Sequence, residues 1–240
     1  MSINNKLSAI NGERNYSYKN CIPVDNFQKF VKKYFVVFST AYLPPIEFFI
    51  YAFLDGEITI EACENYIKQS YRNRCCIYSA NGIYNLIIPI DHEGKLHIPI
   101  GEVKISYTEP WQRMHWRAIT SAYNKSAFFL YYRDHFERFY SDKQKWLIDF
   151  NHDIIVECLK LLKLKKSINY TTEFIKLPEA NDLRTRINPK INSEIVFPSY
   201  TQAFDIKYGF LKNLSIIDLL FNCGPDSQDY IGNAAGKIKV

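Results

Sequence analysis

The sequence has 240 residues, 47% of them hydrophobic and 16% aromatic, which excludes an intrinsically disordered chain and allows one substantial core. Its formal charge of +5 comes from 30 basic residues scattered among 25 acidic ones, which argues against a nucleic-acid-binding protein. The polar N-terminus, the short apolar runs and six cysteines without CxxC spacing predict a cytoplasmic protein with reduced thiols and no membrane span.

The first part of the chain alternates predicted strands with one predicted helix. Residues 1–20 are rich in Asn, Ser and Lys, and they predict a frayed or disordered tail. A buried strand is expected within 31–40. The ring of Pro45 suits the start of a helix over 46–54, because a missing amide proton is harmless in the first turn. The alternating residues 57–63 predict a second strand.

The Asn81-Gly82 corner predicts a β-hairpin, because both residues tolerate the positive φ of a tight turn. It lies between the β-rich runs 75–78 and 83–88. The second run is almost continuously apolar and is followed by Pro89. This pattern predicts a strand that is buried on both faces and ends where proline removes the backbone donor.

Helices dominate the predicted second half of the chain. Apolar residues recur at helical spacing over 111–123, 128–139, 147–162 and 216–221. Ser215, with Asp218 three residues later, predicts the N-cap of the last helix. Strands are expected within 98–106 and 168–175, a long connecting loop over 181–198, and a loose polar tail over 226–240.

Together these elements predict an α/β protein with a single domain over 21–225. We expect a mixed sheet with the antiparallel hairpin at its centre, and helices supplied mainly by the second half of the chain. The order of the other strands stays open, since the hairpin fixes only one pair.

A cationic stretch precedes the hairpin. Lys68, Arg72 and Arg74 have alternating spacing, so in an extended chain their side chains would leave one face, beside Asn73. Guanidinium groups in such a row can hold a carboxylate, a phosphate or a sugar phosphate by bidentate hydrogen bonds. The alternative is that these cations are ordinary surface charges that answer the acids Glu61 and Glu64.

His115 lies on the apolar stripe of the helix predicted over 111–123, where an imidazole is unusual. A partly buried histidine can act as a general base, and the alternative is a hydrogen-bonded core histidine. The sequence has no GxSxG, HExxH, Walker or GxGxxG motif, so neither a metal nor a nucleotide cofactor is indicated.

Four blocks of residues resemble, in their order along the chain, the WbqC-like family of bacterial proteins. They are Lys68 to Arg74, the Ala80-Asn81-Gly82 corner with the strand Leu86 to Pro89, Trp111 with His115-Trp116, and Asn213 to Asn222. The resemblance extends from about Ser39 to Pro225. It departs at Cys223, where the closing block of the family often carries an acid.

The resemblance implies a role in bacterial surface-polysaccharide (O-antigen) biosynthesis, and glycine transfer has been suggested for one member. We therefore expect an aminoacyl or acyl transferase that acts on an amino sugar, with His115 as the base. The alternative is a non-catalytic protein that binds an anionic glycan or a sugar nucleotide.

The expected partners are a sugar or sugar nucleotide and an aminoacyl or acyl donor, with no nucleic acid, metal or cofactor. The substrate-binding residues would be Lys68, Arg72 and Arg74 for the anion, Asn73 and Asn81 for orientation, and Tyr71 or Trp111 for stacking on the sugar. The transferase hypothesis requires that the cationic stretch and His115 face one cavity.

Overall fold

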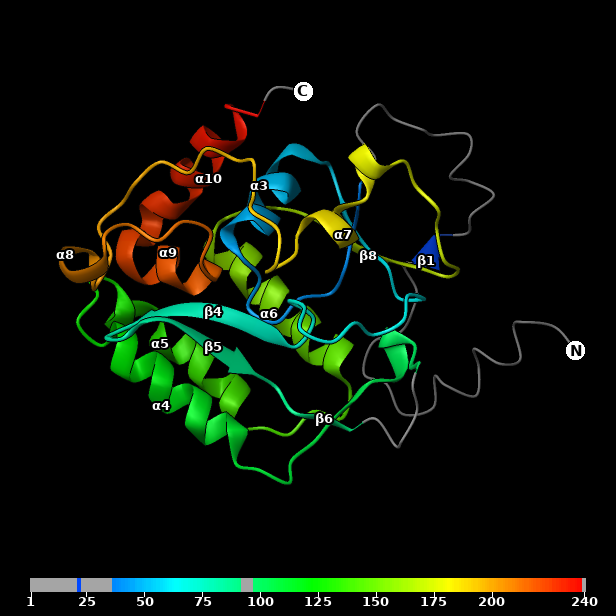
Figure 1. The fold of residues 1–240 in the computed structure, drawn as a ribbon, viewed down its shortest axis with the longest axis horizontal. Helices are drawn as coiled ribbons and strands as arrows, with labels where there is room; N and C mark the ends of the chain where they lie inside the picture. Colours follow the sequence, from blue (N-terminus) through cyan, green and yellow to red (C-terminus); the bar gives the residue numbers. More distant parts are fainter. Residues whose placement is uncertain (1–20, 23–35, 92–96, 239–240) are drawn as a thin grey trace, which may run out of the picture.

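The computed structural model describes residues 21–22, 36–91 and 97–238, and it confirms an α/β protein that contains an antiparallel hairpin. Figure 1 shows the hairpin beside the helices of the second half of the chain, with strands β1 and β8 at the opposite end. The predicted tail over 1–20 lies outside the described residues. None of the described helices is both long enough and apolar enough to cross a bilayer.

Four short strands form a parallel sheet in the order β1-β8-β3-β2. They are β1 (Cys21–Ile22), β2 (Val37–Phe38), β3 (Ile58–Ile60) and β8 (Ile168–Thr171). Every residue of β2 and β3 is buried, as is typical of parallel strands covered on both faces. The strands predicted in these regions are confirmed, and β3 and β8 are shorter than predicted.

Helix α3 (Ile46–Leu54) connects β2 to β3 and completes a parallel β-α-β unit. Pro45 precedes the helix with φ of −64°, which confirms the predicted start. The first two turns are buried because α9 (Ile216–Cys223) and α10 (Ser227–Ala235) pack against the helix. Its single acid, Glu47, is buried with them.

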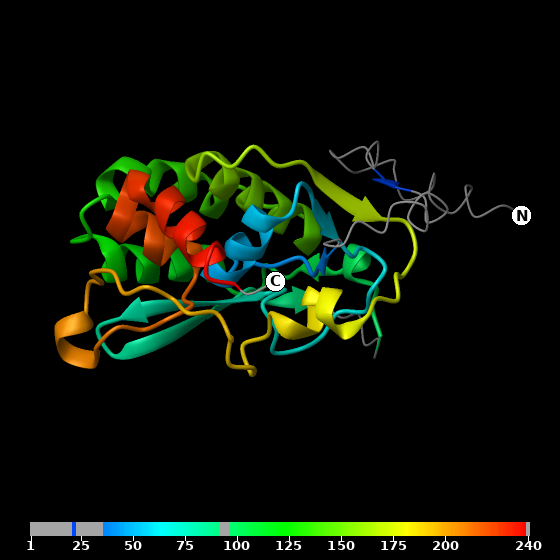
Figure 2. The same cartoon turned by 90° about the horizontal axis from the view of Figure 1, so that it is seen from above.

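The hairpin consists of β4 (Arg74–Ser79) and β5 (Gly82–Ile87), paired antiparallel with Ser79 opposite Gly82. Gly82 has φ of +92°, a conformation that glycine adopts without steric cost. The two strands form a sheet of their own, whereas we predicted one mixed sheet. In Figure 2 the hairpin, in teal, lies on one side of the molecule and the green and red helices lie on the other.

The prediction that the second hairpin strand is buried on both faces is wrong. Ile83 and Tyr84 of β5 are exposed, and Leu86 is the buried residue of that strand. β4 packs against α4 (Trp111–Tyr123), whereas one face of β5 is open to solvent. The apolar sequence of β5 therefore reflects β propensity, which does not require burial on both faces.

Short elements connect the hairpin to the first long helix. They are β6 (Ile90–Asp91), the 3₁₀ turn η2 (Ile100–Glu102) and β7 (Lys104–Ile105), and β6 pairs antiparallel with β7. The strand predicted within 98–106 is thus confirmed only in its second part, because the turn η2 occupies the first.

The three long helices predicted in the second half are confirmed. Helix α4 has the predicted bounds, α5 (Phe129–Glu137) continues into the 3₁₀ turn η3 (Arg138–Tyr140), and α6 (Leu147–Leu161) is the longest of the described helices. Their apolar stripes pack into one core, whose buried members extend from Phe38 to Ala235.

The connection that follows β8 is partly helical. It contains the 3₁₀ turn η4 (Glu179–Asn181) and the short helices α7 (Leu183–Arg186) and α8 (Asp205–Tyr208). The loop predicted over 181–198 therefore includes α7. Asp182 caps this helix, because its carboxylate accepts a hydrogen bond from the backbone N–H of Arg184 at 3.0 Å.

The prediction of a loose tail over 226–240 is wrong for the residues that the structure describes. A 3₁₀ turn, η5 (Gly224–Asp226), leads directly into α10, which packs against α3. Ile231, Ala234 and Ala235 are buried there. Their spacing of three and four residues makes one helical stripe, which the polar composition of this segment concealed.

Candidate functional site

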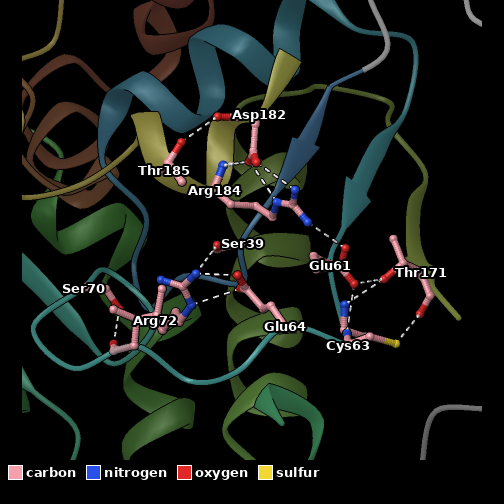
Figure 3. A network of polar contacts seen from close by, with 12 residues as sticks. Ser39, Glu61, Cys63, Glu64, Ser70, Arg72, Thr171, Asp182, Arg184 and Thr185 are labelled. Atoms are coloured by element: carbon pink, nitrogen blue, oxygen red, sulfur yellow. Dashed lines mark hydrogen bonds and ion pairs between the residues drawn. The ribbon is translucent and has the colours of Figure 1, made fainter. Parts of the chain in front are cut away.

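Buried polar residues gather at the carboxyl edge of the parallel sheet (Figure 3). Ser39 follows β2, Glu61 follows β3 and Thr171 ends β8, so these residues emerge at the same edge. Parallel α/β sheets commonly bind ligands at this edge, because the loops there diverge above the strand ends. This edge is therefore a candidate functional site.

The carboxylate of Glu61 is completely buried, and donors from distant parts of the chain surround it. The hydroxyl of Thr171 and the backbone N–H of Cys63, at 3.0 Å, donate to Oε1. The backbone N–H of Ile175, at 3.0 Å, and Nη1 of Arg184, at 2.8 Å, donate to Oε2. Such a set of donors replaces the hydration that the carboxylate loses on burial.

Arg184 joins Glu61 to a second carboxylate. Its Nε and Nη2 donate to the two carboxylate oxygens of Asp182 at 2.8 and 2.7 Å, a bidentate pair. Although burial lowers the pKa of Arg184, its hydrogen bonds with Asp182 raise that pKa on balance. Conversely, burial raises the pKa of Asp182, but the hydrogen bonds from Arg184 bring it below its ordinary value. Both groups are therefore charged at neutral pH.

Arg72 forms a second buried ion pair beside the first (Figure 3). Its Nε donates to Oε1 of Glu64 at 3.0 Å, and its Nη2 donates to Oε2 of Glu64 and to the hydroxyl of Ser39, the latter at 2.7 Å. Burial raises the pKa of Glu64, and Arg72 opposes this shift. We call the set Glu61, Glu64, Arg72, Asp182 and Arg184 the carboxyl-edge network.

The charge of the carboxyl-edge network is slightly negative. Two guanidinium groups face three carboxylates, and each arginine is bound to at least one of them. Because protein carboxylates already occupy both guanidinium groups, an anionic substrate would have to displace an internal ion pair to reach either arginine.

The prediction that Lys68, Arg72 and Arg74 form one cationic face is wrong. Residues 68–73 form turns, and β4 begins only at Arg74, so the alternation of an extended chain does not apply. Lys68 is exposed, whereas Arg72 is only 3% exposed. The alternative, that Arg72 answers Glu64, is what the structure shows, although the pair is buried.

His115 lies in the core, at 6% exposure. Its Nδ1 is 3.0 Å from the hydroxyl of Tyr42, which in turn is 2.7 Å from the hydroxyl of Tyr140. The carbonyl of Ile87 accepts a hydrogen bond from the imidazole, which opposes the effect of burial on the pKa. Burial lowers the pKa of His115 to about 4 nonetheless, so the imidazole is neutral at pH 7. These contacts are the ones that the core-histidine alternative requires.

The other predicted substrate-binding residues lie in different surroundings. Trp111 is 2% exposed and meets His115 edge to face, with ring centroids 5.1 Å apart, so no sugar can stack on it in this structure. Asn73 donates to the carbonyl of Ile88 at 2.8 Å, and Asn81 is exposed at the hairpin corner. Tyr71 is partly exposed.

Tyr71 and Arg72 line a small cavity of about 10 Å³ with Ser39, which is room for about one water molecule. His115 does not line this cavity. The expectation that His115 and the cationic stretch face a common cavity is therefore not met at this position.

A larger cavity, of about 640 Å³, is lined by residues of α3 and α7 and by residues 191–194. We call it the α3–α7 cavity. Its polar lining consists of Glu47, Glu179, Thr185, Arg186, Asn192, Ser193 and Glu194. The volume falls within the range of about 300–1,000 Å³ that is typical of small-molecule sites. Neither His115 nor the stretch 68–74 lines it.

Glu47 is the buried member of this lining, at 3% exposure. The hydroxyl of Ser193 donates to its Oε1 at 2.7 Å, and Nδ2 of Asn213 donates to its Oε2 at 3.0 Å. Burial raises the pKa of Glu47, while these two hydrogen bonds and the charge of Arg186 oppose the shift. A carboxyl group with a raised pKa in a cavity is a candidate for proton transfer or charge recognition.

Glu47 and Glu61 could have been identified as candidate site residues from their places in the sequence. Glu47 is the single acid in an otherwise apolar helix, and Glu61 directly follows a buried strand. An acid in either place must find buried donors or face a cavity. Among the described residues, no group of three His, Cys, Asp or Glu side chains is arranged to hold a metal ion.

Comparisons with known proteins cover the same region. A family model described as the WbqC-like protein family matches residues 40–194 and 184–230. The uncharacterized protein Rv1507c of Mycobacterium tuberculosis is 27% identical over 229 residues, which are 84% of this chain and 98% of that protein. No solved structure matches the chain at a significant level. All residues that line the α3–α7 cavity fall within the matched part.

Proposed function

Because the chain belongs to the WbqC-like protein family, we propose that it acts in bacterial surface-polysaccharide biosynthesis as an aminoacyl or acyl transferase with an amino sugar as acceptor. The observation that carries this proposal is the α3–α7 cavity, which has the size of a small-molecule site and contains the buried carboxyl group of Glu47. The association of the family with surface polysaccharide supplies the biological setting.

The charges of the described residues favour an amine over an anion as the group that is recognised. Arg72 and Arg184 are bound by internal carboxylates, and Arg186 of the cavity is bound by Glu194 at 2.8 Å. An amino sugar brings the opposite charge, together with hydroxyl groups that hydroxyl and carboxylate side chains can hydrogen-bond. This supports the acceptor rather than a phosphorylated carrier as the occupant of the cavity.

The proposed reaction transfers an acyl group from an activated ester or thioester to the sugar nitrogen. The ammonium group first loses a proton to a base, and its nitrogen lone pair then attacks the acyl carbon. A C–N bond forms, the C–O or C–S bond of the donor breaks, and the alcohol or thiol leaves with a proton. His115 is not placed to be this base, because it is buried in the core with its Nδ1 3.0 Å from the hydroxyl of Tyr42.

A second candidate function is glycan or sugar-nucleotide binding without catalysis. The observation that favours it is the position of His115, because the residue predicted to be the base is packed among Tyr42, Trp111 and Tyr140. In this case the same cavity would bind its ligand, and no transfer would follow.

A two-step experiment tests the proposal. Nucleotide sugars with and without an amino group, aminoacyl and acyl thioesters, and neutral glycans are first screened for thermal stabilisation of the purified chain. A ligand at 100 times its Kd should raise the midpoint by roughly 5–10 °C. Each stabilising acceptor is then incubated with each donor, and amide formation is measured by mass spectrometry.

The outcomes separate the two candidates. Amide formation that needs the folded protein supports the transferase, whereas stabilisation by an amino sugar without amide formation under any donor supports the binding protein. A chain that no sugar or donor stabilises would contradict both.

A further inference from the structure

We infer that the α3–α7 cavity binds an amino sugar through its protonated amine, and that the carboxylate of Glu47 receives the ammonium group. The inference rests on the proposed function for the identity of the acceptor, and it adds the site and the residue that recognise it. It follows from three properties of the cavity: the position of Glu47, the remaining hydrogen-bond capacity of its oxygens and the balance of charge around it.

Helix α3 supplies Glu47, which is the buried acid of the cavity lining. The residue lies in the first turn of this helix, two positions after Pro45, and the rest of that turn is apolar and buried. The other acids of the lining, Glu179 and Glu194, are exposed and belong to the segments that follow β8. An ammonium group in the cavity would therefore be attracted most strongly by Glu47, because water screens its carboxylate less than those of Glu179 and Glu194.

The hydrogen bonds of Glu47 leave room for a ligand. Each carboxylate oxygen can accept about two hydrogen bonds. From the part of the chain that the structure describes, Oε1 accepts one side-chain hydrogen bond, from Ser193, and Oε2 accepts one, from Asn213. The side chain is thus fixed from the protein side, and each oxygen retains capacity for a donor from the cavity. A primary ammonium group has three donors, which suits two such oxygens and one further acceptor.

The balance of charge in the lining favours a cation. Three glutamates line the cavity with one arginine, and that arginine is already paired with Glu194 at 2.8 Å and lies over the ring of Tyr51 at 5.5 Å. Three carboxylates and one guanidinium group give the lining a formal excess of two negative charges, although Arg186 also acts on Glu47. A divalent metal ion is disfavoured, because no trio of acidic ligands converges in the described part of the chain.

Binding of simple sugars tests the inference directly. Calorimetry with the full chain at pH 7 would compare D-glucosamine, D-glucose and N-acetyl-D-glucosamine, which differ at one position. We expect glucosamine to bind at least tenfold more tightly than the other two. Its affinity should fall as the pH drops through the raised pKa of Glu47, because protonation removes the charge that holds the amine.

Variants assign the effect to the cavity. We expect Glu47→Gln to weaken glucosamine binding at least tenfold, with glucose binding unchanged. Glu47→Gln places an amide against Asn213 and can reduce folding. Two substitutions in the exposed lining of the cavity, Glu179→Lys and Thr185→Trp, are therefore made in parallel, and we call them the wall variants. Both wall positions are exposed, so each variant should fold and lose affinity, by charge and by obstruction respectively. Glu109→Gln, an exposed acid outside the cavity, is the matched control.

The results distinguish this inference from the proposed function. Equal affinity for glucosamine and glucose, or full glucosamine affinity in a folded Thr185→Trp variant, would overturn the amine site even if transferase activity is found. Amine-dependent binding that is lost in the wall variants would support the site even if no acyl transfer is detected.

Discussion

Arg184 is the residue on which the carboxyl-edge network depends most directly. Its guanidinium group is shared between Asp182 and the fully buried Glu61, which are far apart in the sequence. Buried ion pairs add little to stability by themselves, because the cost of desolvation offsets the attraction. Removing one partner is different, since the other charge then stays buried without its counter-ion.

This asymmetry gives a prediction for Arg184. We expect Arg184→Met to lower the free energy of unfolding by about 3–5 kcal/mol, because Glu61 loses its cationic partner. The double variant Glu61→Gln with Arg184→Met should recover part of the loss, since the completely buried carboxylate is removed and only Asp182, which is half-buried, is left without its partner. Urea unfolding of the three proteins measures both effects. A double variant no more stable than Arg184→Met would contradict the explanation.

Burial of His115 in the core changes the pH at which its imidazole binds a proton. An unfolded histidine binds a proton below about pH 6.5, whereas burial lowers the pKa of His115 to about 4 in the folded state. Between these values the unfolded state binds more protons than the folded state. The stabilising contribution of the neutral imidazole is therefore complete above about pH 6.5 and is lost as the pH falls toward 4.

We expect the free energy of unfolding to decrease by up to about 3 kcal/mol through this group as the pH falls from 6.5 to 4. NMR titration of the imidazole signals gives the pKa, and urea unfolding at each pH gives the energy. A His115 signal that titrates near the ordinary value of about 6.5 would show that the imidazole is not held neutral by the core.

Helix α9 has its predicted position but lacks the predicted side-chain cap. The helix begins after Ser215, but the Ser215 hydroxyl donates to the carbonyl of Leu43 at 2.9 Å and makes no capping hydrogen bond. Asp218, expected to complete the cap, is buried and accepts hydrogen bonds from Tyr123 at 2.9 Å and Tyr200 at 2.6 Å. Tertiary partners replaced the local ones because both side chains point into the core.

Helix α10 is expected to contribute to the stability of the whole domain, since its buried stripe packs on α3. We expect Ile231→Ala to lower the free energy of unfolding by about 2–5 kcal/mol, through lost burial and the cavity that remains. The exposed neighbour Asn233 is the control, and Asn233→Ala should change stability by no more than about 0.5 kcal/mol. If the two variants were equally stable, Ile231 would not contribute to the core, and the segment over 226–240 would behave as the predicted loose tail.

At the scale of the whole molecule, one core connects the parallel sheet to the helices of the second half. Its buried residues extend from Phe38 in β2 to Ala235 in α10, and the hairpin contributes Cys75, Ile77 and Leu86 to it. The carboxyl-edge network and the α3–α7 cavity both lie where segments that follow different strands of the sheet meet.

A shared core predicts cooperative unfolding. The three tryptophans, Trp111, Trp116 and Trp146, report on the helical half through fluorescence, whereas circular dichroism reports on all secondary structure. We expect the two signals to change together in urea, with one midpoint. Separate midpoints would show that the sheet and the helices unfold as independent units.

Much of the secondary structure could be predicted from the sequence, because its causes are local. The helical stripe of α4, the proline before α3 and the glycine at the hairpin corner each act within a few residues. The α/β class followed from these elements. Local signals gave wrong predictions for two elements. One face of β5 is exposed although its sequence is apolar, and α10 packs on the core although its composition is polar.

The residues that form the two sites could not be predicted from the sequence, because only the tertiary structure brings them together. Glu61 and Arg184 are separated by 123 positions, and Glu47 and Asn213 by 166, so no local pattern announces either pair. The sequence alone showed that the chain has charged residues to bury and enough apolar surface to bury them in. Which charges cancel, and which carboxylate is left facing a cavity, was decided only when the chain brought distant segments to one edge of the sheet, because electrostatic pairing depends on distance in space.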